Sequence, residues 1–547
     1  MVFLKKNLII FILFLACFLI FFNLSSGGMY GDDAIYSVRS VGLVDFMFAE
    51  EQPTPLQLFD EFPWWANLSN HDHPPLIFWL QHIFFIFGNS LFLAKLSSAI
   101  FSLLTIFIVY LWVKQEINNK TALLSALFLT INPYFIWFSK ITYLEIGVVF
   151  FIVLTLYFFS KFLKDKKYWP FFGLSLGLTL LTKYTALFIL PVIFFSLLLK
   201  KRTLFKEKKL YLAFLIAVIV ISPVIIYNAM MYKELGHFDL QWAGLLHQDS
   251  PWSLDRSLSK DYLGNLGSLW NTLSNTMSFV YLGIAVLALL YVAVRSKATK
   301  QLHNLQAIIL LSIFSLILFF TFFITPELRF LVLFAPFLAI LLAIFFTIMK
   351  KKIFLFILVI FIIYQAFFTI NSVILTKPIG KENIAYASIK NQDYGINNLD
   401  KYLNNLLKDK NVINRVDFYK KLKIKDPKLQ KYKLENSFDY KTGEKFYPII
   451  VWDPNINWFS GIWLFEKRRF YNNLPFFNAQ EFVKLIKTQK GVGEFYFIKA
   501  TDKGPLTTEK HRQKFSNQLE TQLIEENTEV HNIYRNDGEI AFKIYKK

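Results

Sequence analysis

The chain has 547 residues, of which 55% are hydrophobic, and carries a formal net charge of +20. Long apolar runs repeat until about residue 375, which excludes an ordinary soluble protein and indicates a polytopic membrane protein. The positive-inside rule explains the basic excess, and no RNA- or DNA-binding motif is present, so we expect no nucleic-acid partner. The single cysteine, Cys17, excludes an intramolecular disulfide and a thiol-based metal site.

The first apolar run extends from Asn7 to Leu24, behind Lys5 and Lys6. It resembles a signal peptide but has no clear small-x-small cleavage site, and many more spans follow. We therefore expect a retained first span with a cytoplasmic N-terminus.

Residues 25 to about 92 are predicted to form a long extracytoplasmic loop with helices in the membrane interface. Asp32, in the segment Gly31-Asp32-Asp33, suits the N-cap of a helix with apolar residues at Ile35, Val38 and Val41. Further on, in His71-Asp72-His73-Pro74-Pro75-Leu76, the two prolines suit the first turn of a second helix. Helix starts attract phosphate, so a carboxylate held beside one would suit transfer from a phosphate-linked donor.

The rest of the membrane region is predicted to bring the total to about 11 transmembrane helices, and several of the apolar runs reach the length needed to cross a bilayer. The basic clusters between spans then fall on the cytoplasmic side, and the acidic and histidine clusters fall outside. The remaining spans are expected near 93–112, 121–138, up to 162, twice within 169–199, 210–227, 276–294, 305–324, up to 349, and 353–375.

From about residue 376 the composition becomes polar and rich in Lys and Asn. Alternating strand-like pieces occur at 447–452, 494–498 and 540–545. The fold class is therefore a polytopic α-helical membrane domain, 1–375, followed by an extracytoplasmic α+β domain, 376–547.

Ionisable side chains on the predicted outer side are the candidates for chemistry, because charges at membrane depth are costly and indicate a polar cavity. They are Asp32, Asp33, His71, Asp72, His73, Glu145, Lys183, His237, His247, Glu327 and Arg329.

Each candidate also has a structural explanation. Asp32 can be only an N-cap, with Asp33 facing water. Lys183 can reach toward lipid headgroups, and Arg329 can form an interfacial ion pair with Glu327. Asp72 between two histidines suits zinc or manganese, although residues two apart diverge on a helix. A divalent metal ion therefore stays an open alternative, and His237 and His247 are weaker candidates.

The set is consistent with glycosyl transfer from a lipid phosphate. A carboxylate would take the proton of an acceptor hydroxyl that attacks the sugar C1. Lys and Arg would stabilise the negative charge that grows on the departing phosphate. No Gly-rich nucleotide loop is evident, which favours a lipid-linked donor over a nucleotide sugar.

Five segments over residues 1–375 resemble, in order and spacing, motifs of the GT-C glycosyltransferases, which include the protein O-mannosyltransferases and the lipid A aminoarabinose transferases. The first segment, Gly31-Asp32-Asp33-Ala34-Ile35-Tyr36, is similar to their Asp-Glu-x-x-Tyr motif, and the second, His73-Pro74-Pro75-Leu76, is similar to their His-Pro-Pro-Leu motif. The third, Ser139-Lys140 through Glu145, resembles Ser-Arg-x-x-x-x-Asp, and the fourth, Leu181-Thr182-Lys183, resembles Leu-Thr-Lys. The fifth, Arg329-Phe330-Leu331 with Pro336, resembles Arg-Tyr-Leu-x-Pro.

The resemblance implies an inverting transferase that uses a polyprenyl-phosphate sugar and acts on a lipid, glycan or protein. Asp32 corresponds to the catalytic base with Asp33 beside it, Asp72 to a metal-binding acidic position, and His73 to a phosphate-contacting basic one. Lys183 and Arg329 would bind the donor phosphate. Asp33, Lys140, Glu145 and Phe330 depart from the usual residues, which leaves the sugar and the acceptor open.

A transporter or flippase for a lipid-linked saccharide is the alternative function. Transporters often show paired repeats and charges near the bilayer midplane. Here the charges gather in long outer loops and no repeat is visible, so the enzyme is favoured. The expected location is the inner or plasma membrane, with the active site and the C-terminal domain extracytoplasmic.

Overall fold

A computed structural model describes residues 2–29, 31–47, 53–59, 62–252, 261–299, 304–349, 352–375, 394–407, 449–472, 474, 476–488, 495–506 and 513–547. The chain divides into two compact units. The first contains Met1–Leu24 and Trp65–Ile389, and the second contains Ser25–Trp64 and Lys390–Lys547. The composition boundary near 376 and the first residues of the strand predicted at 447–452 lie outside the described residues.

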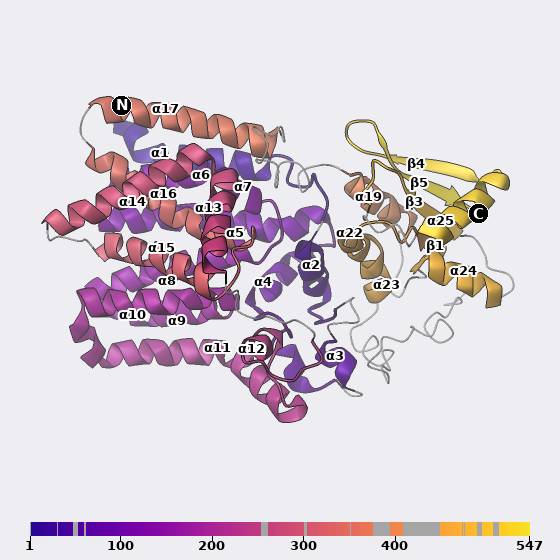
Figure 1. Ribbon diagram of the computed structural model, residues 1–547, viewed down its shortest axis with the longest axis horizontal. Coiled ribbons are helices and arrows are strands. Elements are labelled where there is room, and N and C mark those ends of the chain that lie inside the picture. Colours follow the sequence, from indigo (N-terminus) through magenta and orange to yellow (C-terminus); the bar gives the residue numbers. More distant parts are fainter. Residues whose placement is uncertain are drawn as a thin grey trace. The chain divides into compact units, whose positions relative to one another are not determined.

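The first unit is helical (Figure 1). Its helices are α1 (Val2–Phe21), η1 (Trp64–Asn67), α4 (Leu76–Phe85), α5 (Leu91–Glu116), α6 (Asn119–Thr130), α7 (Pro133–Phe138), α8 (Glu145–Lys164), η2 (Lys166–Tyr168), α9 (Trp169–Leu180), η3 (Tyr184–Phe188), α10 (Ile189–Lys200), η4 (Arg202–Lys206), α11 (Lys208–Leu235), α12 (Leu240–Leu245), α13 (Tyr262–Met277), α14 (Phe279–Thr299), α15 (Asn304–Phe322), η5 (Phe330–Phe334), α16 (Ala335–Ile348), α17 (Lys352–Thr369) and η6 (Ile370–Ile374).

Six of the described helices are long and apolar enough to cross a membrane, and a bent pair, α13 with α14, makes up to seven. Shorter apolar helices lie at Leu8–Phe21, Leu76–Phe85 and Tyr184–Lys200. The prediction of a polytopic helical membrane protein is therefore confirmed. The count of about 11 spans stays a prediction, because several expected spans are shorter or broken helices.

The segment predicted to cross twice within 169–199 is broken near Lys183. Helix α9 ends at Leu180, Lys183 has an extended backbone (φ −165°, ψ 147°), and the chain becomes helical again at Tyr184. Close packing fixes α9 against α11: a Cβ at Gly173 would lie 2.4 Å from the carbonyl oxygen of Ala213. Small residues allow such approach between membrane helices.

The C-terminal part of the second unit contains a five-stranded mixed sheet in the order β2-β1-β3-β5-β4. Strands β2 and β3 run parallel to β1, and β5 runs antiparallel to both β3 and β4. The elements are α19 (Ile396–Leu406), β1 (Ile449–Trp452), α22 (Trp458–Gly461), η7 (Ile462–Glu466), α23 (Lys467–Asn472), β2 (Phe476–Asn478), α24 (Ala479–Thr488), β3 (Phe495–Ala500), α25 (Gln513–Glu525), β4 (Glu529–Tyr534) and β5 (Ile540–Lys546).

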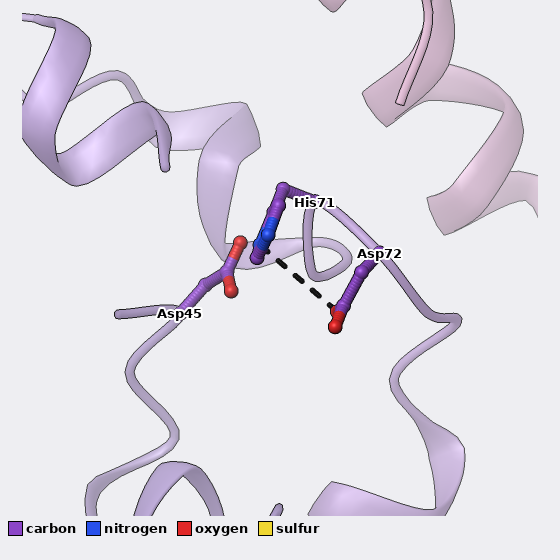
Figure 2. Close-up of side chains that lie close together, drawn as sticks. All are labelled: Asp45, His71 and Asp72. Atoms are coloured by element: carbon purple, nitrogen blue, oxygen red, sulfur yellow. Dashed lines mark ion pairs between the residues drawn. The ribbon is translucent and has the colours of Figure 1, made fainter. Parts of the chain in front are cut away.

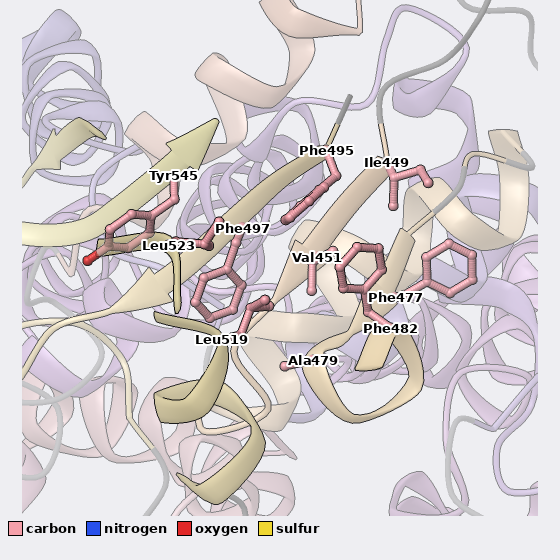
Figure 3. Packing of buried hydrophobic residues seen from close by; sticks show 10 residues of the cluster. All are labelled: Ile449, Val451, Phe477, Ala479, Phe482, Phe495, Phe497, Leu519, Leu523 and Tyr545. Atoms are coloured by element: carbon pink, nitrogen blue, oxygen red, sulfur yellow. The ribbon is translucent and has the colours of Figure 1, made fainter. Parts of the chain in front are cut away.

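The core of this domain lies between the sheet and helices α24 and α25 (Figure 3). Val451 and Phe497 point from neighbouring strands toward Phe482 of α24 and Leu519 of α25, and all four are buried. Alternating apolar residues predicted β1, β3 and β5, and most residues of these three strands are buried. The predicted α+β domain is confirmed.

Helices α2 (Asp32–Gly42) and α3 (Pro55–Leu58) come from the predicted first outer loop. The predicted N-cap at Asp32 is wrong: Gly31 holds the cap position and Asp32 is the first helical residue. The prediction that Pro74-Pro75 lies inside the first helical turn is also wrong, because α4 begins at Leu76 and Pro75 is its N-cap.

Candidate active site

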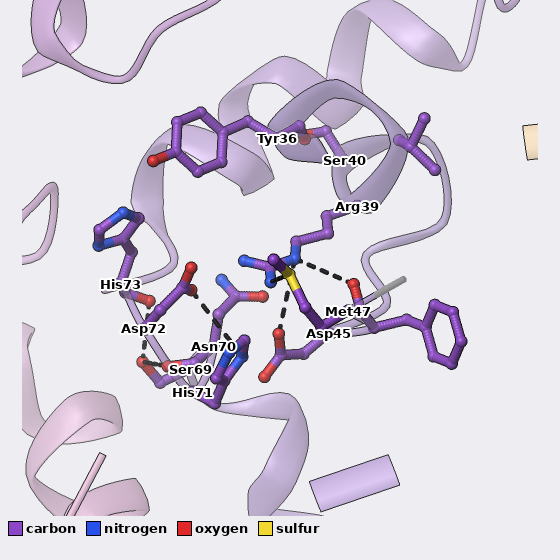
Figure 4. A network of polar contacts seen from close by, with 12 residues as sticks. Tyr36, Arg39, Ser40, Asp45, Met47, Ser69, Asn70, His71, Asp72 and His73 are labelled. Carbon is purple, nitrogen blue, oxygen red and sulfur yellow. Dashed lines mark hydrogen bonds and ion pairs between the residues drawn. The ribbon is translucent and has the colours of Figure 1, made fainter. Parts of the chain in front are cut away.

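The segment His71-Asp72-His73 is a buried loop that leads into α4 (Figure 4). The carbonyl oxygen of His73 accepts a hydrogen bond from the Asn70 N–H at 3.2 Å and one from the Ser69 hydroxyl at 3.4 Å. These bonds close a tight turn around Asp72. His71, Asp72 and His73 therefore lie in a turn and not in a helix. The divergence expected for side chains two residues apart on a helix does not apply to them.

His71 and Asp72 point toward one another across this turn (Figure 2), with 4.0 Å between Nδ1 and a carboxylate oxygen. An imidazole and a carboxylate are two ligands that zinc and manganese accept. The rings of His71 and His237 also lie near Trp252, at 5.9 and 4.8 Å between centroids. The predicted metal role of Asp72 therefore fits the donor types at this turn and stays a prediction.

Two backbone hydrogen bonds join this loop to distant parts of the first unit. The Leu76 N–H donates to the carbonyl of Leu181 at 3.1 Å, and the Leu240 N–H donates to the carbonyl of His71 at 2.8 Å. The first bond brings the His-Pro-Pro-Leu segment to the Leu-Thr-Lys segment that ends at Lys183. Two motifs separated by more than a hundred residues therefore meet at one place.

Lys183 forms a buried ion pair with Glu145, the first residue of α8. The Lys183 ammonium donates to Glu145 Oε1 at 2.6 Å, and both side chains are almost fully buried. The second oxygen, Oε2, is also buried and accepts no hydrogen bond from any residue that the structure describes. An ion pair of this kind holds the ammonium in one position and leaves one carboxylate oxygen for a further donor.

Two cations lie near the ring of Phe330. Its ring centroid is 5.1 Å from the Lys183 ammonium and 4.8 Å from the Arg329 guanidinium. Arg329 is also paired with Glu327 at 2.9 Å, and the Glu327 side chain is half exposed. The predicted phosphate ligands Lys183 and Arg329 thus both lie near one aromatic ring, with Glu145 and Glu327 as their respective counter-ions.

Lys140 does not join this group. Its ammonium donates to the carbonyl oxygen of Phe22, after the end of α1, at 2.7 Å. Burial, followed by the nearby charge of Lys95, lowers the pKa of Lys140 to about 8. This contact is structural, because it anchors the chain that follows α1. His247 is exposed in the turn after α12, where its φ is +51°.

A buried carboxylate that the sequence analysis did not select, Asp239, caps α12. Its oxygens accept hydrogen bonds from the Gln241 and Trp242 N–H groups at 3.1 Å, from the Asn228 amide at 3.0 Å, and from the Tyr184 hydroxyl. Burial raises the pKa of Asp239 from 3.8 to about 6. The N-cap pattern of an Asp before Leu240-Gln241-Trp242 is a signal that could have identified it.

Asp32 and Asp33 belong to the second unit, at the start of α2, and the structure gives them different environments. Asp33 is buried, and its Oδ1 accepts from the N–H groups of Gly31 and Ala34 at 2.8 and 3.1 Å. Asp32 is partly exposed, and the Tyr36 hydroxyl approaches its Oδ2 at 3.4 Å. Asp33 is thus engaged by the backbone, whereas Asp32 is the more accessible carboxylate.

The loop after α2 folds back over the helix through Arg39 (Figure 4). Its guanidinium donates to the Phe46 carbonyl at 3.2 Å and lies 3.7 Å from an Asp45 carboxylate oxygen. Arg39 is only 1% exposed. This contact fixes the C-terminal end of α2.

Residues 72–227 match the model of a family described as dolichyl-phosphate-mannose-protein mannosyltransferase. This range includes Asp72, His73, Glu145 and Lys183. An uncharacterised protein of Aquifex aeolicus is 29% identical over 167 residues, which is 29% of this chain. The matched part spans only 34% of that relative, about a third of its length.

Among solved structures, the chain is similar to ArnT from Cupriavidus metallidurans bound to undecaprenyl phosphate, with a TM-score of 0.56 and 12% identity over 98% of this chain and 97% of that one. The apo state of the same protein gives a TM-score of 0.53 and 11% identity over 100% and 97% of the two chains. The fold is therefore the one seen in ArnT, which is the GT-C fold that the five segments predicted. The chain is a membrane protein with this fold and with a C-terminal sheet domain.

Proposed function

We propose that the protein is an inverting glycosyltransferase that takes a sugar from a polyprenyl-phosphate donor and transfers it to a hydroxyl, or a phosphate, of a lipid, glycan or protein acceptor. The observation that carries the proposal is the buried Lys183–Glu145 ion pair beside Phe330 and Arg329. The proposed location of the reaction is the extracytoplasmic face of the inner or plasma membrane.

The two cations suit the phosphate of such a donor. In the transfer, the bond between the sugar C1 and the phosphate oxygen breaks, and polyprenyl phosphate leaves with an added negative charge. Lys183 and Arg329 would stabilise that charge, and Arg329 can do so with two parallel hydrogen bonds. Glu145 holds the Lys183 ammonium in place, so that little reorganisation is needed when the charge on the phosphate develops.

His73 is a further candidate phosphate ligand, because the Leu76–Leu181 hydrogen bond ties its loop to the segment of Lys183. Asp72 and His71 would hold a divalent ion if one is used, and such an ion would supply additional positive charge for the phosphate. The residues themselves bind and orient the donor.

Asp32 is the proposed general base. Its carboxylate would take the proton of the acceptor as the acceptor oxygen forms a bond to C1 on the face opposite the leaving phosphate, which inverts the configuration. The greater accessibility of Asp32 supports its choice over Asp33, whose Oδ1 accepts from the Gly31 and Ala34 N–H groups. Asp33 then holds the start of α2 in shape.

The test compares wild type with Asp32→Asn in membranes that are supplied with radiolabelled polyprenyl-phosphate sugars. Asp165→Asn is the matched control, because it makes the same chemical change at an exposed residue in the turn after α8. We expect transfer by wild type and by the control, and at least a hundredfold loss in Asp32→Asn, as for removal of a general base.

Donor binding and the amount of folded protein should be unchanged in Asp32→Asn. Full transfer by this variant would remove Asp32 from the base role. Movement of the labelled donor across the bilayer without transfer to any acceptor would instead support a transporter or flippase.

A further inference from the structure

The first outer segment, 25–64, forms one compact unit with the C-terminal residues 390–547. Helix α2, which begins with Asp32, packs against α22 and η7 of the C-terminal domain. The partners of α2 in this unit therefore come from residues more than four hundred positions later in the chain.

Two hydrogen bonds attach the backbone around α2 to that domain. The Tyr471 hydroxyl, on α23, donates to the Val38 carbonyl at 2.6 Å. The Ser460 hydroxyl, on α22, donates to the Met29 carbonyl at 3.1 Å and is fully buried. One bond lies before the helix and one within it, so they fix both its position and its rotation.

Apolar packing completes the attachment. Phe46, in the loop after α2, packs against Phe470 in a tilted arrangement with 4.6 Å between ring centroids. Val44 and Leu56 join them in one buried cluster, with the rings of Phe62 and Tyr471 against it. Since Arg39 ties this loop to α2, the cluster holds the helix as well.

Gly42, the last residue of α2, lies directly on the Tyr471 ring. A Cβ at this position would be 2.2 Å from Cε1 and 3.0 Å from the hydroxyl oxygen. A side chain here must shift the ring, whose hydroxyl donates to the Val38 carbonyl. Gly42 is therefore required by the close approach of Tyr471.

Helix α23 is itself fixed inside the domain. The Arg468 guanidinium donates to the Asp400 carboxylate at 2.7 Å and to the Asn404 side chain at 2.6 Å, both on α19. Arg468 and Asp400 are buried. The ring of Tyr471 is thus presented by a rigid element.

We propose that the C-terminal domain positions the catalytic helix α2, and that Tyr471 with Gly42 is the contact that sets the orientation of Asp32. This inference rests on the proposed function, because it assumes that Asp32 is the base. Tyr471 is a positioning residue and does not touch the reacting atoms.

The test uses the full-length protein in membranes with the variants Tyr471→Ala, Tyr471→Phe, Gly42→Ala and the double variant Gly42→Ala/Tyr471→Ala. We expect kcat for sugar transfer to fall about ten- to a hundredfold in Tyr471→Ala and in Gly42→Ala, since small misplacements of a catalytic group have such effects. The donor KM should stay within about twofold, because the proposed donor ligands lie in the first unit.

The double variant should be no slower than Tyr471→Ala alone, because the added methyl then meets no ring. Tyr471→Phe keeps the ring but loses the hydroxyl that donates to the Val38 carbonyl, so its kcat should lie between those of wild type and Tyr471→Ala. Tyr534→Ala is the control, since it removes a half-exposed tyrosine from β4 of the same domain.

Unchanged kcat in both Tyr471→Ala and Gly42→Ala would overturn the inference, as would a loss of rate explained by loss of folded protein in a thermal unfolding assay. These results are separable from a failure of the proposed function. If Asp32→Asn is inactive while the Tyr471 and Gly42 variants are fully active, only the positioning role fails. If wild type transfers no sugar, the proposed function itself fails.

Discussion

Lys183 and Glu145, 38 residues apart in the chain, form a buried ion pair with 2.6 Å between the ammonium and Oε1. Glu145 is the first residue of α8, and Lys183 lies in the break that follows α9. A buried charge that loses its partner is destabilising, so each residue requires the other.

Single substitutions of Lys183 or Glu145 should therefore destabilise the protein more than the double substitution does. Glu145→Gln and Lys183→Met should each lower the free energy of unfolding by about 3–5 kcal/mol, because each leaves one buried charge without its counter-ion. The double variant should recover part of that loss. Thermal unfolding of the purified protein measures this, and strictly additive losses would contradict a direct pair.

Substitutions of Arg329 and of Glu327 should change the donor KM in opposite directions. Glu327→Gln removes the anion that competes with the donor phosphate for Arg329, so the donor KM should fall by up to several-fold. Arg329→Met should raise it about tenfold or more, since a charge-assisted phosphate contact is lost. Because the Glu327 side chain is 52% exposed, stability should change by less than about 1 kcal/mol in Glu327→Gln. Changes of the donor KM in the same direction would argue against a shared phosphate site.

Asp239 should make the protein more stable at acidic pH. Its folded pKa of about 6 lies above the ordinary value of 3.8, so between these values the folded state binds more protons than the unfolded state. The contribution of Asp239 to the free energy of unfolding therefore falls as the pH rises from 3.8 to about 6. Above pH 6, where Asp239 is ionised in the folded protein, this loss of unfolding free energy is complete and is on the order of 3 kcal/mol.

The comparison for this prediction is Asp239→Asn, which cannot titrate. Unfolding temperatures of both proteins should be measured between pH 4 and 7.5. The difference in unfolding temperature between wild type and variant should change between pH 4 and about 6 and become constant above that. A constant difference throughout would show that Asp239 keeps its ordinary pKa in the folded protein.

Gly173→Ala should lower the stability of the protein, whereas Gly283→Ala should raise it. A Cβ at Gly173 would be 2.4 Å from the Ala213 carbonyl oxygen, so Gly173→Ala must separate α9 from α11 and should cost about 1–3 kcal/mol. Gly283 has open space at its Cβ position in α14, and Ala is the better helix former by up to about 1 kcal/mol. Thermal unfolding should show shifts of opposite sign, and equal shifts would contradict the close α9–α11 contact.

The break at Lys183 illustrates what could be predicted locally. The residues Thr182-Lys183-Tyr184-Thr185 interrupt an apolar run, and the structure has extended backbone there between two helical segments. The strands at β1, β3 and β5 were predicted equally well, since alternation with a period of two follows directly from strand geometry. The helix start at Asp32 was displaced by one residue, because Asp33, and not Asp32, bonds the terminal N–H groups.

The pairing of candidate residues could not be predicted in this way. Lys183 was recognised as a candidate without its partner, because nothing local to Lys183 indicates Glu145. Asp239 was missed, since its burial depends on Tyr184 and Asn228 from other helices. Arg329 and Glu327 were adjacent enough in the chain to be paired correctly.

The sequence by itself determined the membrane class, the GT-C fold and the strands of the C-terminal domain, because hydrophobic period, run length and motif order are properties of neighbouring residues. Only the tertiary structure decided that Lys183 meets Glu145 and shares Phe330 with Arg329, and that α2 belongs with Tyr471 of the C-terminal domain. Such contacts join residues far apart in the chain, and they form only when packing of the whole unit outweighs the entropy of ordering the segments between them.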